Sequence, residues 1–200
     1  MGLFNKSQSK AVQLSERQLL ENKYSSARGN ILLVVVLTVI NIVLLVTNSN
    51  TYFLFSAYIP FILVDFGKLL CGMYPAEYYT DNFAEMEILP KEVFAVTLGI
   101  AIVILVLYVL CWIFSKKFKI GWLITALVFF SVDTLAMLLL NGFVMDSLID
   151  YVIHVWVIFS FANGLVAYRK FKKLPEESAE QAETLVVNGQ PVVGEEQPIE

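Results

Sequence analysis

Four long blocks of apolar residues constrain this chain more than any other feature. Each block approaches or exceeds the roughly 20 residues that a helix needs to cross a bilayer, whereas a soluble core helix is shorter and keeps a polar face. Hydrophobic residues make up 58% of the 200 residues and are concentrated in these blocks. We therefore predict an all-α membrane protein with four transmembrane helices, at about residues 31–47, 93–114, 120–142 and 147–168.

A fifth stretch, YFLFSAYIPFILVDFGKLLCG at residues 52–72, is long enough to cross but contains a proline and two charged residues, which are unfavourable in a spanning helix. Only its first thirteen residues, 52–64, are free of charge, and that length fits a re-entrant or interfacial segment better than a span. Pro60 removes a backbone donor and obstructs helix continuation. Asp65 and Lys68 are spaced to pair on one helix face and point to the outer surface.

The basic residues decide between a crossing and a re-entrant path, because Lys and Arg near helix ends mark the cytoplasmic side. Four crossings place all three basic clusters on one side, whereas five spans put one cluster outside. We predict four transmembrane helices, a Pro-broken re-entrant or surface segment at 52–72, and cytoplasmic N- and C-termini. The alternative is five spans, with 52–72 as a kinked helix. The clusters are Lys6, Lys10, Arg17, Lys23 and Arg28; Lys116, Lys117 and Lys119; and Arg169, Lys170, Lys172 and Lys173.

The two ends differ from the 30–170 membrane-embedded bundle. Residues 1–29 form a polar cytoplasmic segment that we expect to be partly helical, either lying on the membrane surface or running into the first span. Residues 171–200 have seven acids and no base after Lys173, which is typical of a disordered cytoplasmic tail.

Ionisable residues at membrane depth are costly and mark a candidate site. Asp133 lies eleven residues before the turn centred near residue 144, and His154 lies ten residues after it, so in an antiparallel hairpin they lie level. Asp150 lies one turn outward from His154, and Asp146 one turn beyond. Together with Asp65 and Lys68, which we expect nearby, these residues form the candidate binding site.

Two interpretations of this site stay open. The favoured interpretation is structural: a His154–Asp133 contact holds two helices together. The alternative is a line of titratable groups that passes protons or holds a cation. Thr38 and Asn41 form a further polar pair that we expect to make interhelical hydrogen bonds.

No motif indicates catalysis, a cofactor, a metal or a nucleic-acid partner. The phosphate-binding and zinc-protease patterns are absent, and Cys71 and Cys111 belong to no ligand cluster. Apart from the lipid bilayer, the expected partner is another membrane protein or a second copy. Ala95 and Gly99 have the spacing that permits close helix approach to such a partner.

The segments TYFLFSAYIPFILVD, GMYPAEYY and LPKEVF carry a resemblance. With them the chain resembles uncharacterised small multi-pass membrane proteins of Gram-positive, clostridial-type bacteria. The resemblance implies a bacterial plasma membrane and brings no activity with it. The function that we expect is a non-enzymatic accessory, assembly or regulatory one; the alternative is a small transporter or an ion- or proton-binding protein that uses Asp133 and His154.

Overall fold

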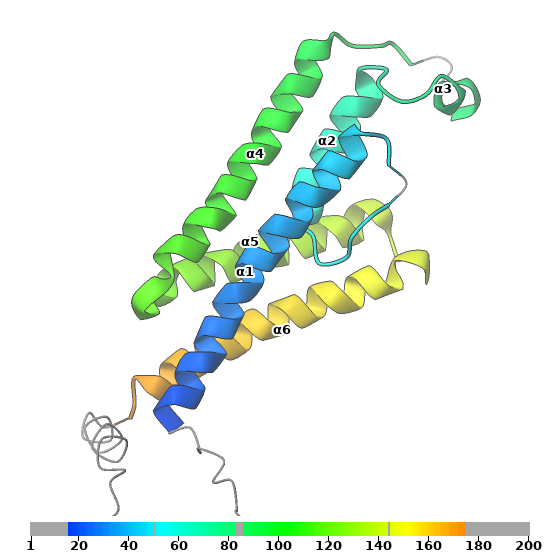
Figure 1. Cartoon of the computed structure of the whole chain (residues 1–200). Helices are drawn as coiled ribbons and strands as arrows, with labels where there is room; N and C mark the ends of the chain where they lie inside the picture. The colour runs from blue at the N-terminus through cyan, green and yellow to red at the C-terminus, as the bar shows by residue number, and fades with distance from the viewer. Residues whose placement is uncertain (1–15, 50, 83–85, 144, 175–200) are drawn as a thin grey trace, which may run out of the picture.

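The computed structural model describes residues 16–49, 51–82, 86–143 and 145–174, and within these ranges it is helical with no strand. The predicted all-α class is therefore confirmed. The described residues form six α-helices and two short 3₁₀ turns, and Figure 1 shows how the α-helices are arranged. They are α1 (Glu16–Val46), α2 (Tyr58–Leu70), α3 (Glu77–Asn82), α4 (Lys91–Phe114), η1 (Lys116–Phe118), α5 (Ile120–Asn141), η2 (Met145–Ser147) and α6 (Leu148–Phe171).

Four of these helices, α1, α4, α5 and α6, are long and apolar enough to cross a membrane. Even the shortest, α5 with 22 residues, is about 33 Å long, against a hydrocarbon core of about 30 Å. Their outward faces expose large apolar side chains such as Val96, Val132 and Val155, which suits a lipid surrounding. The four predicted spans are thus present.

The polar leader is helical where it is described, because α1 begins at Glu16 and continues without interruption into the first span. Of the two alternatives, the leader therefore forms a helix that runs into the first span. Its residues Leu20, Tyr24 and Ala27 are buried against the rest of the bundle. Residues 1–15 and the predicted acidic tail beyond Leu174 lie outside the described residues.

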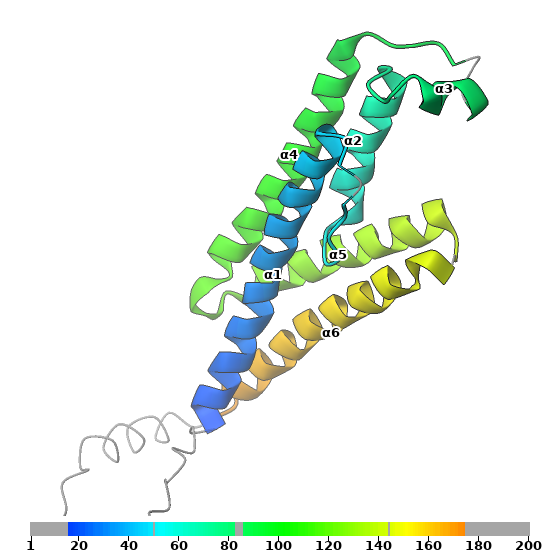
Figure 2. The same cartoon turned by 45° about the vertical axis from the view of Figure 1, so that its right-hand side comes forward.

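The long helices form two groups. In Figures 1 and 2, α1, α2 and α4 run side by side, while α5 and α6 form an antiparallel hairpin set at an angle to them. The N-terminal half of α1 packs on the C-terminal half of α6, where a Cβ on Gly164 would lie 2.5 Å from the Cβ of Ala27. Glycine at this crossing therefore permits the two helices to approach closely.

The 52–72 stretch enters and leaves the bundle at the same end. After α1 the chain turns back, passes between the two helix groups as an extended segment with a bend at residues 54–55, and reaches α5 (Figure 2). The helix α2 then returns to the end where α1 finished. With 13 residues α2 is about 20 Å long, too short to cross a bilayer. The prediction of four helices that can span is confirmed, and the 52–72 stretch forms no fifth helix of spanning length.

The prediction that Pro60 breaks a helix was wrong. Pro60 does not interrupt a helix: it occupies the third position of α2, in the first turn, where its missing N–H has no intrahelical partner to lose. The helix begins instead after Ala57, whose backbone is extended. What Pro60 contributes is a fixed backbone angle at the start of α2.

The three basic segments are fastened together at one end of the bundle. The Tyr24 hydroxyl donates to the Ser115 carbonyl oxygen at 2.8 Å, and the Arg28 Nε donates to the Ser115 hydroxyl oxygen at 2.9 Å. The ring of Phe118 stacks on that of Phe171, with centroids 4.4 Å apart. The start of α1, the α4–α5 turn and the end of α6 therefore share one side of the molecule.

Candidate functional site

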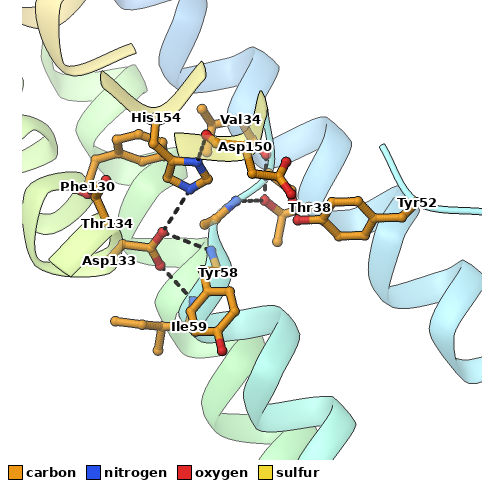
Figure 3. A network of polar contacts seen from close by, with 12 residues as sticks. Val34, Thr38, Tyr52, Tyr58, Ile59, Phe130, Asp133, Thr134, Asp150 and His154 are labelled. Carbon is orange, nitrogen blue, oxygen red and sulfur yellow. Dashed lines mark hydrogen bonds and ion pairs between the residues drawn. The ribbon is translucent and has the colours of Figure 1, made fainter. Parts of the chain in front are cut away.

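Asp133, buried at the middle of α5, bonds the start of α2 (Figure 3). Its Oδ2 accepts a hydrogen bond from the backbone N–H of Tyr58 at 2.8 Å, and its Oδ1 accepts one from the N–H of Ile59 at 2.7 Å. These are the first two residues of α2. Asp133 thus caps a helix to which it does not belong, and its carboxylate faces the positive end of that helix dipole.

With Asp133 in place, every N–H at the start of α2 has a partner or is missing. The Ala57 N–H donates to the Thr38 hydroxyl oxygen at 2.7 Å, and Pro60 has no N–H. The Thr38 hydroxyl in turn donates to the Val34 carbonyl oxygen at 2.6 Å. A helix that begins at membrane depth needs such a complete set, because each unsatisfied backbone group costs several kcal/mol in lipid.

Asn41 holds the extended segment in the same way. Its amide nitrogen donates to the Phe53 carbonyl oxygen at 2.6 Å, and its Oδ1 accepts from the Phe53 N–H at 2.8 Å. The side chain replaces the neighbouring strand that this backbone lacks. We expected Thr38 and Asn41 to form hydrogen bonds with another helix. They bond the backbone of the re-entrant segment instead. In the sequence, the signal for these two residues is a pair of polar side chains about one turn apart in an otherwise apolar helix.

His154 meets Asp133 across the α5–α6 hairpin, as their equal distance from the turn predicts. Its Nε2 lies 3.8 Å from the Asp133 Oδ2, and both side chains are almost fully buried. Its Nδ1 lies 2.8 Å from the Asp150 carbonyl oxygen, and because a carbonyl only accepts, this nitrogen carries hydrogen. The Nε2 atom is buried and has no hydrogen-bond partner among the described residues.

Asp150 joins the group through its main chain. In Figure 3 its carboxylate points toward Thr38 and Tyr52 and away from the His154 ring. Its Oδ1 is buried without a hydrogen-bond partner in the described part of the chain. The predicted line of side chains from Asp150 to His154 is therefore linked by a backbone carbonyl. Asp146, the next member of that line, has a side chain outside the described set.

Asp65 and Lys68 form a separate cluster at the other end of α2. Lys68 lies ten residues after Tyr58, or about 15 Å along the helix axis. Its buried Nζ donates to the Leu45 carbonyl oxygen at 2.6 Å, near the C-terminal end of α1 where a cation is favoured. These two residues do not join the His154 group, contrary to the expectation from the sequence.

Contrary to our expectation, Asp65 and Lys68 do not pair directly but are joined through Tyr74. No ion pair joins them within the described ranges, and Tyr74 contacts both. The Tyr74 hydroxyl donates to the Asp65 Oδ1, and the Lys68 ammonium lies 4.0 Å from the centre of the Tyr74 ring. Burial lowers the pKa of Lys68 from its ordinary value, and the Asp65 carboxylate opposes that shift.

The class of this protein follows from its fold: four apolar helices make it a multi-pass membrane protein. Comparisons with protein-family models, curated proteins and solved structures found no match to this chain. Across the residues described, no three His, Cys, Asp or Glu side chains lie close enough together to hold a metal ion. The geometry of the polar residues is therefore the basis for a functional proposal.

Proposed function

We propose that this chain is a non-enzymatic accessory, assembly or regulatory component of a bacterial plasma membrane. The observation that carries the proposal is the use of Asp133. Both oxygens of this intramembrane carboxylate bond the backbone of α2, so its hydrogen-bonding capacity serves the fold. A carrier needs such a group to exchange partners during each cycle. Here an exchange would leave two backbone N–H groups unpaired in the membrane.

The proposed orientation has cytoplasmic N- and C-termini and α3 on the outer side. Supporting it are the basic residues at the shared end of α1, α6 and the α4–α5 turn, because cytoplasmic ends carry the excess of Lys and Arg. The opposite end holds the acidic connection before α4, which includes Glu77 and Glu87.

The proposed contact with a partner is the face of α4 around Ala95 and Gly99. Both residues are exposed, and a Cβ placed on Gly99 would meet no other part of the described chain, beyond its own turn of helix, within 4 Å. The opposite face of α4, with Thr97 and the buried Ala101, is the one that packs internally. A small-residue face that is open in the monomer supports close packing of another membrane helix, from a second protein or a second copy.

One observation favours the alternative, a small ion- or proton-binding protein. His154 Nε2 and Asp150 Oδ1 are both buried without a hydrogen-bond partner among the described residues, and Nε2 faces the Asp133 carboxylate. Unpaired titratable atoms at membrane depth are typical of proton relays.

Proteoliposomes test the two proposals against each other. Purified full-length protein would be reconstituted with a pH-sensitive dye inside, and a pH gradient and a membrane potential imposed. We expect the wild type, His154→Ala and Asp133→Asn to leak protons no faster than protein-free liposomes. A wild-type flux that disappears in His154→Ala and persists in Ser131→Ala would establish the alternative. Ser131 is a matched control because its hydroxyl bonds only its own helix, at Leu127.

The accessory role needs a positive result as well. A photo-crosslinking residue at Gly99, in native membranes, is expected to give one discrete protein adduct. The same residue at Val132, on the exposed face of α5, should give only lipid adducts. Lipid adducts alone at both positions would remove the proposed partner face.

A further inference from the structure

A groove of about 450 Å³ runs between α1 and α6 at the basic end of the molecule. Lys23 of α1 and Lys170 of α6 line one end of it, and Trp156 lines the other. Asn163 lies seven positions before Lys170, and Trp156 lies seven positions before Asn163, so that all three are on one face of α6. The groove therefore extends about 21 Å along the helix, close to the thickness of one leaflet with its headgroups.

The end of the groove that Lys23 and Lys170 line is positively charged. Both Lys23 and Lys170 are exposed, and neither has an ion-pair partner within the described ranges. Ten basic residues and only two acidic ones, Glu16 and Glu21, occupy the described segments at this end of the molecule. A negatively charged group between the two lysines is thus met by an excess of cations. The ten are Arg17, Lys23, Arg28, Lys116, Lys117, Lys119, Arg169, Lys170, Lys172 and Lys173.

The middle of the groove is polar at a depth where polarity is costly. Asn163 is exposed on the outward face of α6, and its amide has no hydrogen-bond partner in the described part of the chain. Ser160 accepts a hydrogen bond from the Asn30 amide at 2.6 Å and keeps its own hydroxyl hydrogen to donate. Donors that face lipid in a spanning helix are favourable only where the molecule beside them offers acceptors.

The deep end is apolar. Trp156 and Phe159 are exposed, and both present aromatic surface to the membrane. From the lysines inward the lining thus changes from cationic, through hydrogen-bond donors, to aromatic and aliphatic. That order matches one molecule with a charged head, ester carbonyls and hydrocarbon chains.

We propose that this groove binds an anionic glycerophospholipid of the leaflet at the basic end. Its phosphate lies between Lys23 and Lys170, its ester oxygens face Asn163 and Ser160, and one acyl chain follows Trp156 and Phe159. Basic pockets between transmembrane helices hold anionic headgroups by this chemistry. A soluble phosphate would use the charged end alone and would leave the donors at Asn163 and Ser160 without acceptors.

Trp156 provides the test, because it lines the groove. In a full-length Trp112→Phe/Trp122→Phe background it is the only tryptophan left, since the chain has three. Its fluorescence would be measured in vesicles that contain brominated phosphatidylglycerol or brominated phosphatidylcholine with identical chains. We expect phosphatidylglycerol to quench more strongly. Each replacement, Lys23→Gln and Lys170→Gln, should reduce the preference about fivefold.

Lys119→Gln/Lys173→Gln is the matched control, with the same change in charge at the same end but outside the groove, and should keep the preference. Equal quenching by the two lipids, or a preference that survives Lys23→Gln/Lys170→Gln, would overturn the proposal. So would loss of the preference on addition of inorganic phosphate but not of chloride at equal ionic strength, which would identify a soluble phosphate ligand. Native mass spectrometry of the wild-type chain should show bound phosphatidylglycerol that the double lysine variant lacks.

Discussion

At the scale of single residues, Asp133 acts as the N-cap of a helix from which it is separated by some 75 positions in the chain. An N-cap usually comes from the residue just before the helix, but Ala57 stands there and has no side-chain acceptor. Supplying the acceptors from α5 links the start of α2 to the α5–α6 hairpin. The same carboxylate also faces His154, so one residue joins three elements.

Replacing Asp133 with Asn should destabilise the protein. The amide offers one oxygen where two acceptors are used, so the N–H of Tyr58 or Ile59 loses its partner inside the membrane. We expect a loss of about 1–3 kcal/mol. Thermal unfolding of the purified protein in detergent measures this loss, and Ser131→Ala on the same helix should unfold close to the wild type. If Asp133→Asn and Ser131→Ala unfold together with the wild type, the capping role of Asp133 is wrong.

At the scale of elements, α2 is a short helix held at both ends and along one side. Asp133 bonds its first turn, and Lys68 in its last turn bonds the Leu45 carbonyl of α1. Along its length it packs mainly on α4, at a place where Gly67 faces Thr97. A Cβ on Gly67 would lie 2.0 Å from the Thr97 Oγ1, so only glycine permits this approach.

Gly67→Ala should therefore separate α2 from α4. Thr97 has to move or the helices have to part, and overpacking of this kind costs about 1–3 kcal/mol. The free energy of unfolding in a detergent titration measures the effect, and Gly67→Ala/Thr97→Ala should recover part of it. Gly99→Ala is the matched control on α4: its Cβ meets nothing within 4 Å, so stability should stay the same or rise. Equal destabilisation by the two alanines would contradict this packing.

At the scale of the whole molecule, the re-entrant segment decides on which side each connection lies. The α1–α2 and α3–α4 connections share one end, and the α4–α5 turn lies at the other with the described ends of the chain (Figure 1). An odd number of crossings would separate the basic segments that Tyr24, Arg28 and Phe118 hold together.

Cysteine labelling tests this topology. In a background without the two native cysteines, both of which are buried, single cysteines would replace Ser49, Glu87 and Lys119. A membrane-impermeant maleimide should label positions 49 and 87 on intact cells, and position 119 only after permeabilisation. Labelling of 49 and 87 from opposite sides would require α2 to cross the bilayer.

Much of the fold follows from local properties of the sequence. Apolar length gave the four spans, because the hydrocarbon thickness sets a minimum for a crossing helix. The charges at the helix ends gave the even number of crossings and hence the re-entrant segment. The facing of Asp133 and His154 followed from their equal distances to a short turn. The first and last of these depend only on a dimension of the bilayer or on residues close in sequence, and the charge argument needs only the sign of each connection, so none of them requires the helix packing to be known.

The sequence by itself determined the class of fold, the helices that cross and the depth of the polar residues. Only the tertiary structure decided what those polar residues bond: Asp133 to the start of α2, Asn41 to Phe53, and Lys68 to the end of α1. Periodicity places a side chain on a face and at a depth, but not against a chosen neighbour. The partners here are backbone groups exposed at helix ends and in an extended segment, and their positions are fixed only when the helices pack.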